Sequence, residues 1–136
     1  WESEPGQVHM LLRSSEGEIF RSDSADYGVT WCRPYTIGLP NNNSGIDVVI
    51  TDDRLLVLCM NPVSDNWGLR VPIVLMTSAD NGLTWECEAV LEDKISDDPN
   101  TRTEYSYPSV ISMGNELHIT YTNNRKSIAY HRMIRN

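Results

Sequence analysis

At 136 residues, the chain has the length of a single domain and can bury a sizeable core. Its net charge of −8 at pH 7 excludes the basic surface of a nucleic-acid-binding domain, and no apolar run approaches the roughly 18 residues of a membrane-spanning helix. The three cysteines are an odd number without a His or Cys partner at zinc-ligand spacing, so we expect no closed disulfide framework, no metal and no other cofactor.

Short strand patterns follow one another along the chain, and no helical stretch of convincing length separates them. Apolar and β-branched residues predict strands at residues 8–13, 19–22, 47–50, 55–60, 71–77, 88–91, 108–112, 117–122 and 127–133. Two loops rich in turn-forming residues, 40–45 and 92–103, separate groups of these strands. The pattern indicates an all-β protein.

One octapeptide occurs twice, as Ser-Ala-Asp-Tyr-Gly-Val-Thr-Trp at 24–31 and as Ser-Ala-Asp-Asn-Gly-Leu-Thr-Trp at 78–85. Its Asp can accept hydrogen bonds from the backbone of a tight turn, its Gly supplies a positive φ, and its Trp packs beside the neighbouring strand. We therefore interpret Asp26 and Asp80 as structural. A calcium loop would need more acidic residues at alternate positions and a closing Glu.

A repeat of about 50 residues made of short strands is typical of the blades of a β-propeller, each a four-stranded antiparallel sheet. The chain is predicted to hold about three blades in one partial propeller domain, residues 1–136, with approximate boundaries 1–40, 41–95 and 96–136. Propellers have at least about four blades. We therefore expect either that the rest of the propeller is missing or that two copies assemble into a six-bladed ring, which makes a homo-oligomer the predicted protein partner.

The octapeptide resembles the Asp box, or BNR repeat, of sialidases (neuraminidases) and related propellers. Four further stretches resemble segments of the sialidases in the same order: Val8–Arg13, Leu39–Gly45, Asn61–Arg70 and Glu104–Pro108. They correspond to the strand with the second arginine of the sialidase triad, an Asn-rich loop, the segment with the third arginine, and the Tyr-Ser motif of the nucleophile. The resemblance covers nearly the whole chain and implies the C-terminal half of a six-bladed sialidase-like propeller.

The resemblance implies that Arg13 and Arg70 bind the carboxylate of an acidic carbohydrate and that Tyr105 attacks the anomeric carbon. Guanidinium groups bind carboxylates in a bidentate manner, and sialidases use a Tyr nucleophile. Each role has a plainer alternative. Arg13 and Arg70 can be ordinary solvated arginines, and Tyr105, with Tyr107 two residues further on, can be a packing tyrosine.

Other polar residues are interpreted as structural. Plain turn chemistry explains Asn41, Asn42 and Asn43 slightly better than contacts with sugar hydroxyls. The histidines lie in predicted strands without metal-ligand spacing; they are His9, His118 and His131.

The chain also departs from the sialidase pattern. The first arginine and the acid/base Asp of the family lie in the other half of the propeller, and the Glu that activates the Tyr is expected before Trp1. Glu2 and Glu4 are the nearest acidic residues, but both are too close to Arg13 for a hairpin to intervene. The leading hypothesis is therefore a sialidase-like exo-glycosidase module that is inactive alone. The alternatives are a non-catalytic carbohydrate-binding or assembly module that dimerises, and a pure scaffold. The N-terminus indicates no compartment, which leaves a cytoplasmic and a secreted bacterial protein open.

Overall fold

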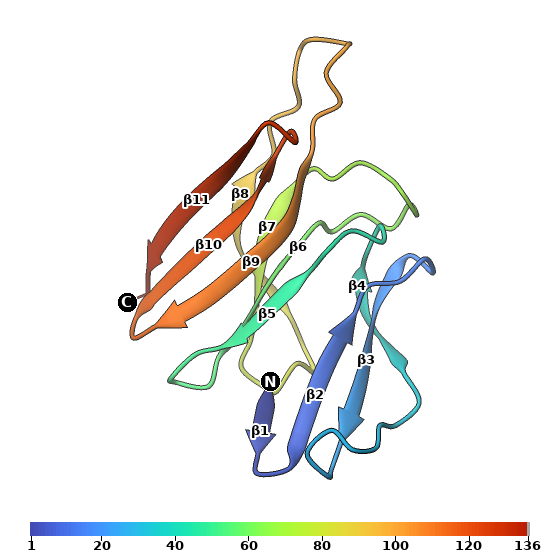
Figure 1. Ribbon diagram of the computed structural model, residues 1–136, viewed down its shortest axis with the longest axis vertical. Coiled ribbons are helices and arrows are strands. Elements are labelled where there is room, and N and C mark those ends of the chain that lie inside the picture. Colours follow the sequence, from blue (N-terminus) through green and yellow to red (C-terminus); the bar gives the residue numbers. More distant parts are fainter. Residues whose placement is uncertain (136) are drawn as a thin grey trace.

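The computed structural model describes residues 1–135 as three antiparallel sheets side by side (Figure 1). The first sheet contains β1 (Glu2–Glu4), β2 (Gln7–Leu12), β3 (Glu18–Ser24) and β4 (Tyr35–Pro40). The second contains β5 (Asp47–Ile50), β6 (Leu56–Met60), β7 (Ile73–Ser78) and β8 (Glu86–Glu92). The third contains β9 (Tyr105–Met113), β10 (Glu116–Asn123) and β11 (Ser127–Ile134).

Each sheet is a meander in which neighbouring strands follow one another along the chain. This arrangement confirms the all-β class and the number of about three propeller blades. The third sheet has three strands within residues 1–135 rather than four. None of these residues forms a helix of the length and apolarity that crosses a membrane.

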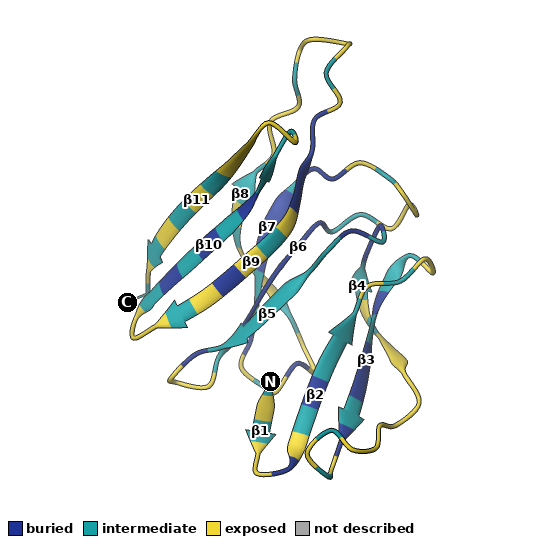
Figure 2. Ribbon diagram, viewed as in Figure 1, coloured by how far each residue is buried: buried dark blue, intermediate teal, exposed yellow. Residues whose placement is uncertain are grey.

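The second sheet lies between the other two, and its central strand β6 is completely buried (Figure 2). Side chains alternate along β6: Val57 and Cys59 belong to the apolar cluster shared with the third sheet, and Leu58 and Met60 to the cluster shared with Ile19 of the first sheet. Such period-two alternation is expected of a strand with one neighbour on each face. The core therefore consists of two layers between three sheets.

Both repeated octapeptides form the turn between the third and fourth strands of their sheets. In the first, the Ser24 hydroxyl accepts from Gly28 N at 2.9 Å, and the Asp26 carboxylate accepts from Thr30 N at 2.8 Å. The second turn repeats this geometry, with Asp80 accepting from Thr84 N at 2.9 Å. Each Asp side chain thus accepts hydrogen bonds within its own turn, as the sequence predicted.

These hydrogen bonds make the first turn sensitive to acid. Bonds from the side chain and backbone of Thr30 and from Ser24 lower the pKa of Asp26 from 3.8 to about 2. Because the folded-state pKa is depressed, the stabilisation is complete above the unfolded-state value and is lost as pH falls from about 4 through 2. We predict that Asp26→Asn lowers the melting temperature at neutral pH, and that its difference from wild type shrinks towards zero below pH 2. Thermal unfolding followed by circular dichroism at several pH values measures this; a difference that stays constant with pH would contradict it.

Candidate functional site

The candidate site lies at the end of the sheets opposite the two octapeptide turns. The loops at 41–46, 61–72 and 93–104 gather at this end, the upper end in Figure 1. Arg70 closes the second of these loops and forms an isolated parallel bridge with Glu104, in which Tyr105 N donates to Arg70 O at 3.0 Å. This bridge joins the second and third sheets beside the site.

Arg70 is the centre of the cluster. Its side chain is 8% exposed, and its Nη1 donates to Glu104 Oε1 at 3.0 Å. Its guanidinium also lies over the ring of Tyr107, 5.0 Å from the ring centroid. The arginine therefore makes an ion pair and a cation–π contact at the same time.

Glu104 is the counter-ion of two arginines. Its second oxygen, Oε2, accepts from Arg125 Nε at 3.0 Å, while Oε1 also accepts from the Ser106 hydroxyl at 2.6 Å. Burial raises the pKa of Glu104, but the bonds from Ser106 and Arg125 and the charge of Arg70 outweigh it and lower the pKa. The carboxylate is thus ionised at neutral pH. Two guanidinium charges against one carboxylate leave the cluster with one surplus positive charge.

Tyr107 is the tyrosine that faces this cluster. Its side chain is 52% exposed, and its backbone has a φ of 53°. Its ring lies so close to Gly45 that a Cβ at that position would approach Tyr107 Cδ1 to 3.3 Å. A hydrogen bond from Arg70 and the charge of that guanidinium lower the pKa of the Tyr107 hydroxyl. Arg70 therefore stabilises the phenolate form of this residue.

Tyr105 lies in the core instead. Its side chain is 7% exposed, its hydroxyl donates to Lys94 O at 3.0 Å, and its ring meets Tyr121 edge to face at 6.1 Å. Burial, followed by the negative charges of Glu92 and Asp93, raises the pKa of the Tyr105 hydroxyl. These contacts are those of a packing tyrosine.

A bulge separates the environments of the two tyrosines. Strict alternation would place residues 105 and 107 on the same face of β9. The register between β9 and β10 shifts, however, from Thr120 opposite Ser109 to Thr122 opposite Ser106. The bulge includes the positive φ of Tyr107 and directs its side chain outward.

Arg13 follows β2 directly and is exposed. No hydrogen bond or ion pair within residues 1–135 joins it to the cluster around Arg70. The next residue, Ser14, donates its N–H to Asn41 Oδ1 at 3.3 Å, and Asn42 Nδ2 donates to Leu69 O at 2.7 Å. The loop at 41–46 therefore connects the turn of Arg13 to the loop of Arg70.

The asparagines around the site bind backbone groups. Asn61 follows β6, and its Nδ2 donates to Pro72 O at 2.7 Å and to Tyr105 O at 3.0 Å. Its Oδ1 accepts from the Ser44 hydroxyl at 3.0 Å. One side chain thus fixes all three segments that carry the site.

Sequence reasoning missed Glu104 and Arg125 as members of the site. Glu104 is the first residue of the predicted nucleophile segment Glu104–Pro108, so its position was the available signal. Arg125 lies in the turn after β10, 21 residues away from Glu104, and carries no local signal. With Arg102 and Asn124, these two residues line a small hollow beside the cluster.

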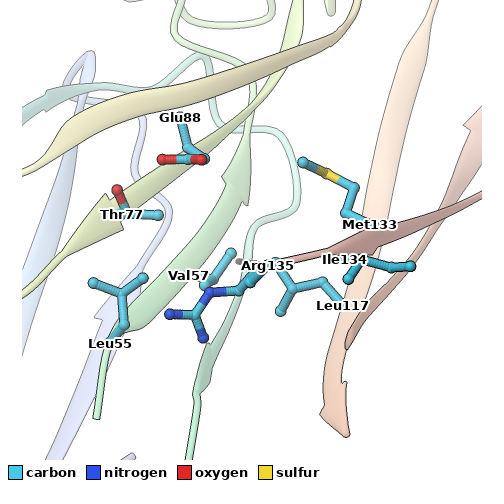
Figure 3. Close-up of a pocket in the computed structure, with 8 residues that line it drawn as sticks. All are labelled: Leu55, Val57, Thr77, Glu88, Leu117, Met133, Ile134 and Arg135. Carbon is cyan, nitrogen blue, oxygen red and sulfur yellow. The ribbon is translucent and has the colours of Figure 1, made fainter. Parts of the chain in front are cut away.

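A second hollow, of about 360 Å³, lies between the second and third sheets and contains none of the predicted site residues (Figure 3). The side chain of Arg135 extends across it near Val57 and Leu117, and binds Asp53 with Nη2 at 2.7 Å from Oδ2. Since an ion pair and apolar side chains occupy its walls, we assign it no ligand. The described residues contain no group of three or more His, Cys, Asp or Glu placed to hold a metal ion.

The comparisons with known proteins agree with this architecture. The family model described as BNR repeat-like domain matches residues 1–119. No curated protein sequence matches the chain significantly.

Three solved structures illustrate the structural similarity. The NanB sialidase from Streptococcus pneumoniae is 14% identical, with a TM-score of 0.66 over 88% of this chain and 19% of that chain. The α-L-arabinofuranosidase Arb93A from Fusarium graminearum is 15% identical, with a TM-score of 0.72 over 99% and 44%. The leech intramolecular trans-sialidase is 13% identical, with a TM-score of 0.71 over 98% and 22%. The chain thus spans less than half of each of these proteins, and at such identities the likeness shows the fold alone.

The environments of the two tyrosines predict opposite shifts in their ionisation. We expect Tyr107 to ionise below the ordinary pKa of 10.0 because Arg70 stabilises its phenolate, and Tyr105 to ionise above it because it is buried. In a titration of phenolate absorbance, Tyr107→Phe should remove amplitude below pH 10 and Tyr105→Phe amplitude above it. Loss of the low-pH amplitude in Tyr105→Phe would contradict the geometry.

Proposed function

The chain belongs to the BNR repeat-like domain family, and on that premise we propose that its sialidase-like propeller blades bind an acidic sugar at Arg70 and Tyr107. The observation that carries the proposal is the surplus positive charge of the cluster. Arg70 and Arg125 share the single carboxylate of Glu104. A second carboxylate, that of the ligand, would complete the charge balance, and guanidinium groups bind such anions through two parallel hydrogen bonds.

Tyr107 supports the same proposal because a tyrosine is suited to be the nucleophile for an acidic sugar. A neutral phenol is not repelled by the ligand carboxylate, whereas the Asp or Glu nucleophile of most glycosidases would be. The hydroxyl loses its proton only as it attacks, and Arg70, which lowers the pKa of Tyr107, stabilises the phenolate that then forms. We therefore assign to Tyr107 the nucleophile role that the sequence predicted for Tyr105, whose hydroxyl is engaged with Lys94 O.

Glu104 takes a positioning role in this proposal. It contacts Arg70 and Ser106 through one oxygen and Arg125 through the other. Removal of the carboxylate would leave two guanidinium groups without their shared partner. Arg13, by contrast, is proposed as a second carboxylate ligand on the resemblance to sialidases alone.

We propose that turnover needs groups beyond this chain. The resemblance places the first arginine and the acid/base Asp in the other half of a six-bladed propeller. The chain by itself would then be a binding module for an acidic carbohydrate, which a second half-propeller completes as an exo-glycosidase.

Arg70 provides the test of binding. We predict that N-acetylneuraminic acid binds to the wild-type chain and that Arg70→Gln weakens binding roughly 10- to 100-fold, the range for hydrogen bonds to charged groups. Arg70→Lys should weaken it less, since the charge stays while the bidentate geometry is lost. Isothermal titration calorimetry measures these affinities.

The matched control is Arg33→Gln, at an exposed arginine in the connection between β3 and β4, which should bind as wild type does. Thermal unfolding checks that the Arg70 variants are folded, because Glu104 loses a buried partner. Equal affinity for a neutral sugar of the same size, or unchanged affinity in Arg70→Gln, would refute the proposal. Cleavage of a fluorogenic sialoside by the isolated chain would refute the need for a second half.

We propose separately that a second copy of the chain completes the six-bladed ring; such a copy would duplicate Arg13 and Arg70 and would not supply the acid/base Asp. Within the described residues, β11 pairs on one side only, with β10, and exposes Ile128, Tyr130 and Ile134. A long strand edge with exposed apolar residues favours association. We predict a dimeric mass in sedimentation equilibrium and a shift towards the monomer in Ile128→Lys. A monomeric wild type would contradict the six-bladed ring of two copies.

A further inference from the structure

A second cluster of reactive side chains lies on the first sheet, at the end that carries the octapeptide turns. Ser3 on β1, His9 on β2 and Asp23 on β3 stand on three adjacent strands, with His9 directly opposite Asp23 in the register. Ser3 Oγ lies 2.7 Å from His9 Nε2, and His9 Nδ1 lies 2.5 Å from Asp23 Oδ1. The order hydroxyl, imidazole, carboxylate is that of an activated serine.

The carboxylate of Asp23 favours the tautomer of His9 that carries its proton on Nδ1. Burial raises the pKa of Asp23, but hydrogen bonds from Tyr35, His9 and Arg21 outweigh it and lower the pKa. An ionised carboxylate only accepts hydrogen bonds, so the proton between it and His9 stands on Nδ1. His9 Nε2 is then the acceptor, and Ser3 donates its hydroxyl proton to it.

Arg21 lies close to the same ring, with Nη2 2.9 Å from His9 Nδ1. With the proton on Nδ1 this contact is a close approach of two donors, whereas the other tautomer would make Nδ1 the acceptor of Arg21 Nη2. Its Nε donates to Asp23 Oδ1 at 2.7 Å, and its Nη1 donates to Asn81 O at 2.6 Å. Arg21 thus holds the carboxylate in place and ties the first sheet to the second octapeptide turn.

Asn81 supplies a donor next to His9 Nε2 and lines one hollow with Ser3. The indole of Trp1 donates to Asn81 Oδ1 at 2.7 Å, which turns the amide nitrogen of Asn81 to within 3.4 Å of His9 Nε2. Trp1 also stacks on His9, with ring centroids 5.0 Å apart. An Asn side chain beside the nucleophile is one of the donors that form oxyanion holes.

Ser3 is accessible from two open hollows. One is shared with Tyr27 and the other with Asn81, and Arg54 lines both and donates to Ser3 O. The carboxylates that line these hollows are Glu2, Glu4 and Asp80. Three carboxylates against the one guanidinium of Arg54 disfavour anions.

We propose that Ser3 and His9, with Asp23 as positioning residue, form a hydrolytic site for small, neutral O-acyl esters, with Asn81 as the oxyanion donor. Ser3 Oγ bonds to the ester carbonyl carbon while its proton passes to His9 Nε2. Collapse of the tetrahedral intermediate breaks the bond to the alcohol oxygen, which takes that proton. Water then attacks the acyl-serine, its proton passes through Nε2 to Ser3 Oγ, and the carboxylic acid leaves. The site does not depend on the function proposed for Arg70.

The experiment uses the whole chain with 4-nitrophenyl acetate as substrate and a fluorophosphonate as covalent probe. We expect the probe to label Ser3, as mapped by mass spectrometry of peptides, and Ser3→Ala to abolish both labelling and ester cleavage. Asn81→Ala should lower kcat roughly 100-fold with the same labelled peptide. The matched control, Ser15→Ala, changes an exposed serine in the turn between β2 and β3 and should leave both readouts unchanged.

Asp23 has its own readout, since it acts through His9. Asp23→Asn should lower kcat roughly 100-fold at unchanged KM, and Asp23→Glu should restore part of it. Thermal unfolding separates these effects from misfolding. The peptide map of the labelled wild type tests the proposal even if a variant does not fold. Failure of the wild type to label at Ser3, labelling spread evenly over other serines, or ester cleavage that survives in Ser3→Ala would overturn the proposal.

Discussion

The burial of β6 on both faces is the constraint on which the rest of the structure depends. Each buried aliphatic side chain on this strand is worth about 1.5–3 kcal/mol, and alternate residues contribute to the contact with the first and with the third sheet. The neighbouring strand β7 makes the same alternating contribution, with Ile73 and Leu75 in the cluster of the third sheet and Val74 in that of the first. Asn61 continues directly from β6 and binds Pro72 O and Tyr105 O, so the same strand that joins the blades also fixes the loop of Arg70 and the start of β9.

The blades could be predicted from the sequence because the repeated octapeptide uses only local chemistry. Its Ser, Asp and Gly make bonds within eight residues, so the turn forms alike in both copies. Strands β1 and β4 escaped prediction. β1 has three residues, and its pairing with β2 is extended by the backbone of Trp1 bonded to His9. β4 contains Gly38 at a positive φ and ends at Pro40, both unfavourable in a strand, and pairing with β3 overrides these preferences.

The candidate site could be predicted only in part, because its contacts join residues that are far apart in the sequence. Arg70 was found because it lies in a recognisable segment, but its ion pair with Glu104 joins residues 34 positions apart. The roles of Tyr105 and Tyr107 depend on a bulge in β9 whose register is set by β10. The sequence of β9 alone does not reveal this bulge, because a bulge is a property of two paired strands. Distant pairing therefore decides which tyrosine faces Arg70.

The net charge of −8 also conceals how charge is distributed. At one end of the sheets Arg70 and Arg125 share one carboxylate, which favours an anionic ligand. At the other end the carboxylates around Ser3 outnumber the guanidinium of Arg54, which disfavours an anionic ligand. Electrostatic potentials of opposite sign at the two ends would attract ligands of opposite charge before any specific contact forms. An acidic sugar that carries an O-acyl group would therefore be bound at the Arg70 end and repelled from Ser3, so that the two sites would act on different molecules.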